Sequence, residues 1–192
     1  QKQAYINEVR TFRVYCYYNV FEVFGSVIPL TISTDTSVLP VSAMDGMTFE
    51  EGNAKICDWM ISELDETLPS LAKNGSVNRC NQAMNRMIKM RILLNSETFT
   101  GVPRFDECKQ LAKDIIDGNF GTYVIAEDYK SIYSANNNTE CKEIVFAFSS
   151  DVVYNKRSTN MRNGPFMSYV FTSYFNTKEE HAGWNCCCLT PS

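Results

Sequence analysis

Trp184 and its neighbours carry the residue types in this chain that are best suited to binding a ligand. Gly183 and Asn185 flank the indole, so an aromatic face and a side-chain amide lie together on one short segment. A flat aromatic ring covers the apolar face of a pyranose, while amides, hydroxyls and guanidinium groups meet the sugar hydroxyls. Trp184 and Asn185 supply both kinds of group together, so they are candidates for contact with a sugar. The alternative is that the indole fills the core of a loop, as buried tryptophans commonly do.

Tyr169, Tyr174 and Arg162 are further candidates for glycan contact. They are chosen for their chemistry and for their place in the same segment. From Asp151 onward the chain holds many Asn, Ser, Tyr and Phe residues with no helical period. Aromatic residues in a polar, irregular segment are more typical of binding surfaces than of cores.

Catalytic and metal-binding patterns have little support in the sequence. The carboxylate pairs Glu50-Glu51 and Glu179-Glu180 are adjacent, so their side chains diverge rather than flank one substrate atom. No G-x-S-x-G, H-E-x-x-H or phosphate-binding loop is present. His181 lies near the run Cys186–Cys188, but no cysteine pair has the C-x-x-C spacing of zinc or thioredoxin sites. We expect free thiols, no metal, no cofactor and no enzymatic activity; the alternative is a redox or metal protein that uses the cysteine run.

Bulk properties set the class of protein. A chain of 192 residues with 44% hydrophobic residues supplies the core of one ordinary domain. A net charge of -4 gives no general attraction for nucleic acid or anionic lipid. No run is long enough to span a bilayer, and Gln1-Lys2-Gln3 is not the start of a signal peptide. We expect the chain to be part of a longer protein.

The residues that position these candidates form a helical pattern. The first predicted helix runs from about Tyr5 to Phe24, and Gly25 and Pro29 end it. Its apolar face is predicted to hold residues spaced by three to four positions: Val9, Phe12, Cys16, Val20 and Phe24.

Three more helices follow. Thr48 and Glu51 read as the capping box of the second, and Asn81 as the N-cap of the third, which runs to about Asn95. The fourth spans Asp106 to Asp117. We interpret Trp59, on the second helix, as a packing residue.

The segment Leu93 to Glu107 is the turn between the third and fourth helices. Two closely connected amphipathic helices must bury their apolar faces against each other or against a third element. We therefore predict a mainly α fold with tetratricopeptide-like helical hairpins and a loop-rich, minor-β region toward the C-terminus. Residues 1–126 form the helical scaffold. Residues 127–192 form the irregular, aromatic-rich part of the same domain, including a short strand at Lys142 to Ser149.

The order of these motifs resembles the SusD/RagB family of surface glycan-binding lipoproteins of Bacteroidetes-type bacteria. The motifs that carry the resemblance are Glu8-Val-Arg-Thr-Phe-Arg13 with Tyr17-Tyr18, Phe24-Gly-Ser-Val-Ile-Pro-Leu30, Asn95-Ser-Glu-Thr-Phe-Thr-Gly-Val-Pro-Arg-Phe105, Ile115-Ile-Asp-Gly118, and Asn137-Asn138 before Glu143-Ile-Val-Phe146. The resemblance covers about Tyr5 to Trp184. The cysteine run at Cys186 and the polar stretch 157–163 depart from it.

The resemblance implies a function. A family member of this kind binds oligosaccharide or polysaccharide at the cell outer membrane and delivers it to a SusC-like TonB-dependent barrel. Its contact with the membrane would be through a lipid anchor outside this chain. The resemblance also places Trp184 in the aromatic arc that stacks on glycan. The alternative is a helical-repeat module that binds protein and has no role with sugars.

Overall fold

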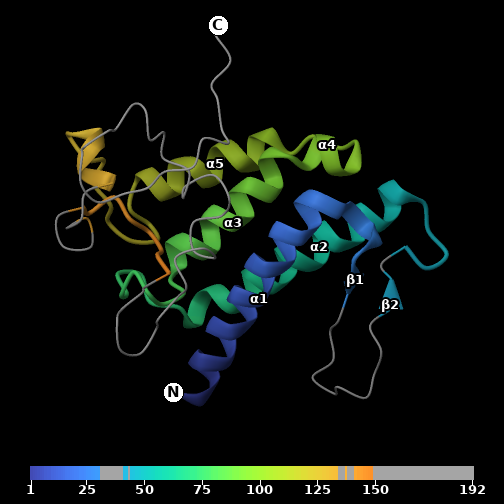
Figure 1. The fold of residues 1–192 in the computed structure, drawn as a ribbon, viewed down its shortest axis with the longest axis horizontal. Helices are drawn as coiled ribbons and strands as arrows, with labels where there is room; N and C mark the ends of the chain where they lie inside the picture. The colour runs from blue at the N-terminus through green and yellow to red at the C-terminus, as the bar shows by residue number, and fades with distance from the viewer. Residues whose placement is uncertain (31–40, 43, 134–136, 138–140, 149–192) are drawn as a thin grey trace, which may run out of the picture. The chain divides into compact units, whose positions relative to one another are not determined.

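The computed structural model is mainly helical, as predicted (Figure 1), and describes residues 1–30, 41–42, 44–133, 137 and 141–148. Its elements, in chain order, are α1 (Lys2–Phe24), η1 (Gly25–Val27), β1 (Pro29–Leu30), β2 (Val41–Ser42), α2 (Phe49–Thr67), η2 (Leu68–Ser70), α3 (Gln82–Leu94), α4 (Ser96–Thr100), α5 (Phe105–Ile116) and η3 (Tyr129–Tyr133). No helix in the described ranges is long and apolar enough to cross a membrane.

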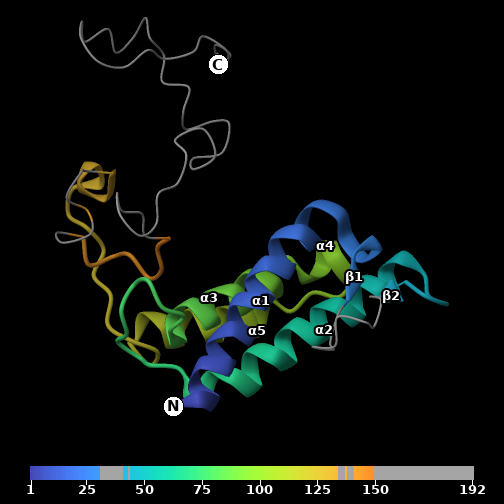
Figure 2. The ribbon, with the colours of Figure 1, turned by 60° about the horizontal axis from the view of Figure 1, so that its bottom comes forward.

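Gln1–Ala147 form one compact unit, and Phe148–Ser192 are grouped as a second. In the first unit α2 packs against α1 and α3, and α3 packs against α5 (Figure 2). The two strands pair antiparallel, with Pro29 opposite Ser42. The apolar core lies between the helices and includes Val14, Tyr18, Phe21, Ile56, Met60, Leu64, Ile88, Ile92 and Leu93. The predicted domain boundary between residues 126 and 127 stays a prediction.

The predicted ends of the helices are confirmed to within a few residues. The Thr48 side chain accepts a hydrogen bond from the backbone N–H of Glu51, and the Glu51 carboxylate accepts from the backbone N–H of Thr48, which makes a capping box. Asn81 caps α3 by accepting from the N–H of Met84. Gly25 follows α1 with φ of 64°, a backbone conformation that favours glycine.

The buried face of α1 is not the predicted one. The side that packs on the core holds Asn7, Thr11, Val14, Tyr18 and Phe21. The predicted positions lie elsewhere: Val9 is 68% exposed, Val20 44% and Phe24 59%, Cys16 is exposed, and Phe12 is partly buried. The reason is a set of polar partners on α2 and α3 that the apolar spacing of α1 does not reveal.

Thr11 of α1, Thr67 of α2 and Asn85 of α3 form a buried hydrogen-bonded cluster. We call this cluster the joint between the three helices. The Thr11 hydroxyl oxygen lies 3.0 Å from both Asn7 O and Thr67 Oγ1, so its one proton serves these two acceptors. Asn85 Nδ2 donates to Thr67 Oγ1 at 3.1 Å and to Leu64 O at 3.0 Å. A buried polar group is tolerated only when it is hydrogen-bonded, so the joint fixes how α1 faces α2 and α3.

Arg86, on α3, extends this joint with a buried charge. It is 5% exposed. Its Nε and Nη2 both donate to Asn85 Oδ1, at 2.9 and 2.7 Å, and Nη1 lies 2.7 Å from the Asp65 carboxylate. Because its hydrogen-bond and ion-pair partners Asn85, Asp65 and Leu64 lie on α2 and α3, the guanidinium joins these two helices.

The prediction of a strand at Lys142 to Ser149 is wrong. The structure describes residues 142–148 of this segment, and they form no strand. A strand needs a backbone ladder with a partner, and here single bonds replace it. Ala147 N donates to Val77 O at 2.8 Å, and the Asn81 side chain donates to Val145 O at 2.8 Å. The segment is therefore held beside the start of α3 by isolated hydrogen bonds.

The joint predicts the effect of Asn85→Ala. The substitution removes donors to Thr67 and Leu64 and the acceptor of buried Arg86, so we expect a loss of about 2–4 kcal/mol in the free energy of unfolding. Urea unfolding followed by circular dichroism measures this. Asn95→Ala, at the end of α3, serves as the control with a loss of about 1 kcal/mol or less. Equal losses of unfolding free energy in the two variants would contradict a larger contribution from the buried joint than from the end of α3.

A second prediction concerns Glu63, which accepts from Arg10 and Arg13 of α1 at 2.7 Å each. Hydrogen bonds from Arg10, and then from Arg13, lower the pKa of Glu63. The stabilisation is therefore present above the ordinary carboxyl pKa and is lost as the pH falls through the lowered value. We expect Glu63→Gln to cost stability at pH 7 and to cost much less near pH 3. A loss that is independent of pH would contradict the ion-pair account, and Glu97→Gln is the control.

Candidate functional site

The residues that the sequence proposes as a glycan site lie outside the described residues. They are Trp184, Asn185, Tyr174, Tyr169 and Arg162. Their assignment stays a prediction. Two features of the described structure are candidates in their own right: a pocket beside α2 and an exposed tyrosine pair at η3.

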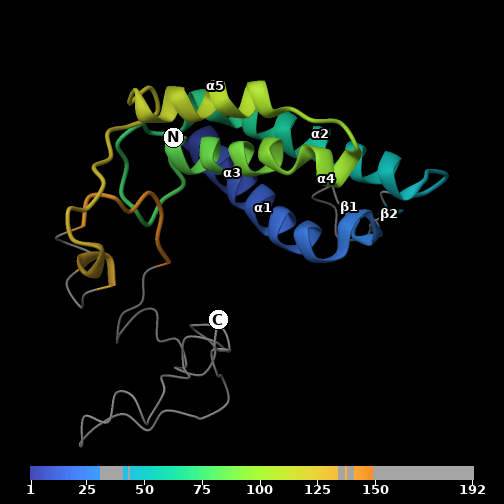
Figure 3. The same cartoon turned by 90° about the horizontal axis from the view of Figure 1, so that it is seen from above.

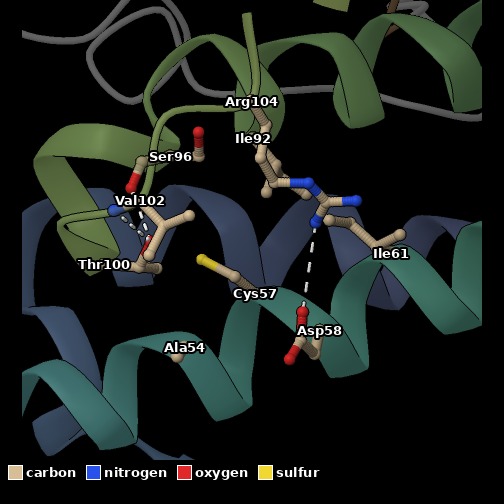
Figure 4. A pocket seen from close by; sticks show the side chains of 9 residues that line it. All are labelled: Ala54, Cys57, Asp58, Ile61, Ile92, Ser96, Thr100, Val102 and Arg104. Carbon is tan, nitrogen blue, oxygen red and sulfur yellow. Dashed lines mark hydrogen bonds and ion pairs between the residues drawn. The ribbon is translucent and has the colours of Figure 1, made fainter. Parts of the chain in front are cut away.

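The pocket lies between α2, the end of α3, α4 and the loop that leads into α5 (Figure 4). Its volume is about 210 Å³. The lining side chains are mainly apolar, with charge at the rim: Ala54, Cys57, Asp58, Ile61, Ile92, Ser96, Thr100, Val102 and Arg104. An engineered apolar cavity of roughly 150 Å³ holds one benzene ring, so this pocket has room for one small ring or an aliphatic group.

The segment Leu93 to Glu107, predicted to be a turn, forms one wall of the pocket. A short helix, α4, interrupts this turn, which the sequence analysis did not foresee. The Thr100 hydroxyl donates to Ser96 O at 2.8 Å and accepts from Val102 N at 3.3 Å. Gly101 adopts φ of 72°, so the chain reverses there and carries Val102 to the pocket.

Arg104 supplies the positive charge at the rim. Its Nε and Nη2 donate to the two oxygens of Glu107, both at 2.7 Å, and Nη1 lies 4.0 Å from Asp58. The bidentate bond to Glu107 raises the pKa of Arg104 and lowers the pKa of Glu107. Two carboxylates therefore surround one guanidinium, and the rim gives an anionic ligand no net attraction.

Cys57 and Ser96 define the chemistry deeper in the pocket. Burial raises the pKa of the Cys57 thiol to about 12, so the thiol stays protonated at neutral pH and is a poor nucleophile or metal ligand. Ser96 is 3% exposed, and its Oγ has no hydrogen-bond partner among the described residues. The pocket therefore suits a neutral, mostly apolar group that offers at most one hydroxyl or carbonyl.

Within the described part of the chain, no three His, Cys, Asp or Glu side chains gather closely enough to hold a metal ion. Trp59 is half-buried and packs against the core, as the sequence predicts. Its ring makes an edge contact with Tyr17 at 5.0 Å between centroids, and Arg13 lies 5.4 Å from its centre. This indole therefore packs against other side chains of the helical unit.

The exposed tyrosine pair is formed by Tyr129 and Tyr133, the first and last residues of the 3-10 helix η3. Their rings are 69% and 63% exposed, with centroids 5.2 Å apart at 61° and hydroxyls 3.1 Å apart. Asp128 holds the turn, because its backbone carbonyl accepts from Ser131 N at 3.0 Å and its carboxylate accepts from Lys130 N at 3.0 Å. Two aromatic faces and two hydroxyls are thus presented to solvent by an ordered turn.

The motifs of the sequence do not mark this pair as a site. The signal that could have found it is the spacing Asp128-Tyr129-x-x-x-Tyr133 in a segment without an apolar period. An acidic residue before a turn, with aromatics four residues apart, indicates a hydrogen-bonded turn that places both rings on one side.

Comparison with known proteins leaves the family open. A scan against protein-family models finds no match to this chain, and a search of curated proteins finds no matching relative.

The pocket chemistry predicts different reactivities for two thiols. We expect iodoacetamide at pH 8 to alkylate exposed Cys16 at least about tenfold faster than Cys57, because Cys57 is buried and its pKa is about 12. Peptide mapping by mass spectrometry follows both sites in one sample. Rapid labelling of Cys57 in the folded protein would contradict the burial of this thiol, and labelling in urea supplies the unfolded reference.

Proposed function

We propose that this protein binds oligosaccharide or polysaccharide without catalysis, at the surface of a bacterial outer membrane. The observation that carries the proposal from the described structure is the exposed pair Tyr129 and Tyr133. Solvent-facing tyrosines have the chemistry that covers a pyranose face and meets its hydroxyls. The sequence resemblance to SusD/RagB glycan-binding lipoproteins supports the same class of ligand.

The mainly helical scaffold agrees with this proposal. Helices α2 and α3 pack against each other, and Arg86 joins them. Binding residues are often held on loops that a rigid scaffold positions. We propose tetratricopeptide-like hairpins for the scaffold and place Trp184, Asn185, Tyr174, Tyr169 and Arg162 in the ligand-binding part.

Delivery of the glycan to a TonB-dependent outer-membrane barrel belongs to the same proposal, as does a lipid anchor outside this chain. The resemblance alone supports these two points. A protein-binding helical module is the second candidate, and the exposed apolar side of α1 favours it, with Val9 at 68% and Val23 at 72% exposure.

Affinity electrophoresis in gels with embedded polysaccharides tests the proposal. We expect at least one glycan to retard the native protein, and the double change Tyr129→Ala, Tyr133→Ala to weaken the affinity about fivefold to tenfold. The matched change of both tyrosines to Phe keeps the rings, so it should retain most of the retardation. Trp184→Ala tests the second assignment in the same gels.

Three results separate the possibilities. Indifference of the native protein to a broad polysaccharide panel would contradict glycan binding. Retardation that survives the Tyr→Ala changes and is lost in Trp184→Ala would keep the function and move the site. Retardation unchanged in all variants would remove both site assignments. Phe105→Ala, an exposed aromatic on α5, controls for general loss of surface aromatics.

A further inference from the structure

Asn74 and Gly75 place two groups that can react with each other in the loop between η2 and α3. In an Asn-Gly pair the backbone nitrogen of the glycine can attack the side-chain carbonyl carbon of the asparagine, because glycine has no side chain to obstruct the approach. Asn74 is exposed and Gly75 is partly buried. Figure 3 shows this loop, in green, beside the segment that follows α5. The loop therefore presents a modifiable amide to water.

The backbone nitrogen of Gly75 has no hydrogen-bond acceptor among the described residues. The turn that follows begins one residue later, because Asn78 N donates to Ser76 Oγ at 3.4 Å and Arg79 N donates to Ser76 O at 3.0 Å. A hydrogen-bonded nitrogen would have to give up its acceptor before it could attack, which costs free energy. Gly75 has none to give up, so its nitrogen meets no such barrier.

The carbonyl that this nitrogen would attack is already polarised. Thr122 N donates to Asn74 Oδ1 at 3.0 Å. A donor in this position stabilises the negative charge that develops on the oxygen as the nitrogen attacks the carbon, as in an oxyanion hole. The close approach depends on Gly121, where a Cβ would lie 2.4 Å from Lys73 O and 3.1 Å from Asn74 Oδ1. The fold therefore prepares the electrophile as well as the nucleophile.

We propose that Asn74 deamidates spontaneously in the folded protein, with the Thr122 N–H stabilising the oxyanion. Gly75 N forms a bond to Asn74 Cγ, the bond from Cγ to Nδ2 breaks, and the proton that Gly75 N loses leaves on ammonia. The product is a cyclic succinimide that joins residues 74 and 75. Water then adds to either of its carbonyl carbons and opens the ring, which gives aspartate or isoaspartate at position 74. Nothing is oxidised or reduced, and water is the only other reactant.

The two products differ in their effect on the contact with Thr122. An aspartate keeps a side-chain oxygen that accepts from the Thr122 N–H. In an isoaspartate the main chain runs through the side-chain carbon Cγ, so it becomes longer by the Cβ methylene. We expect the isoaspartate form to lose the hydrogen bond and to loosen the loop from the segment after α5. Either product adds one negative charge, so deamidation changes the surface of this loop in one direction only.

Peptide mapping by mass spectrometry after incubation at pH 8 measures deamidation, and chromatography separates aspartate from isoaspartate. We expect Asn74 in the native protein to deamidate at least as fast as in the same chain unfolded in guanidinium chloride, where Thr122 no longer donates. The other Asn-Gly pair of the chain, Asn163-Gly164, is measured in the same digests. In the unfolded chain it supplies the rate of an Asn-Gly pair without this donor.

Two variants assign the roles. Gly75→Ala adds a Cβ that obstructs the attack and should slow deamidation at least about tenfold. The loop should tolerate this change with a small shift, because Gly75 has no positive φ and the new Cβ would lie 3.3 Å from Ala72 Cβ. Gly121→Ala forces its segment away from Lys73, so it removes the Thr122 donor and should slow deamidation about threefold to tenfold. If circular dichroism shows that Gly121→Ala unfolds the protein, Thr122→Pro removes the same N–H.

Three results would overturn the proposal. One is slower deamidation of Asn74 in the native protein than in the unfolded chain, because the fold would then protect the amide. Another is an unchanged or higher rate in the folded Gly121→Ala or Thr122→Pro variant, which would show that Thr122 restrains the amide rather than activating it. The third is aspartate without isoaspartate, which would indicate direct hydrolysis by water instead of attack by Gly75.

Discussion

The buried hydrogen bonds among Thr11, Thr67 and Asn85 are the constraint on which the described structure depends. Each group loses water on folding, so each needs its partner from another helix. Because the three residues lie on α1, α2 and α3, satisfying them sets the rotation of α1 about its own axis. Asn85 also accepts from Arg86, so the same joint brings a buried guanidinium into the packing.

This rotation determines which surfaces remain for binding. It sends Val14 and Tyr18 into the core and leaves Val9 and Val23 in solvent. The packed helices also position the turn between α3 and α5, and this turn lines the pocket around Cys57. The pocket is small and its rim charges are paired, so it suits one neutral group. An extended glycan fits better on an open surface such as the tyrosine pair at η3.

Much of the helical framework was predictable, because its signals are local. Thr48 with Glu51, Asn81 and Gly25 each act within one turn of the chain, and all three mark real helix ends. The buried face of α1 was not predictable. Apolar spacing favours Val9 and Val20, whereas the face that is buried is selected by Thr67 and Asn85, more than fifty residues away.

For the candidate site, too, the sequence reveals local signals but not contacts between distant residues. Residue types identify Trp184 and Asn185 as candidates, but no local rule decides whether an aromatic ring faces solvent or core. Tyr129 and Tyr133 could be found only from the turn that Asp128 holds. The strand expected near Val145 fails for a related reason, since β-rich composition forms a strand only where a partner offers a ladder.

The rotation of α1 is open to one direct measurement. Val9→Cys and Val14→Cys, each in a Cys16→Ser background, are labelled with a maleimide in the native state and mapped by mass spectrometry. The account predicts rapid labelling at position 9 and protection at position 14 that is lost in urea. Protection at position 9 with rapid labelling at position 14 would contradict the polar joint as the determinant of this fold.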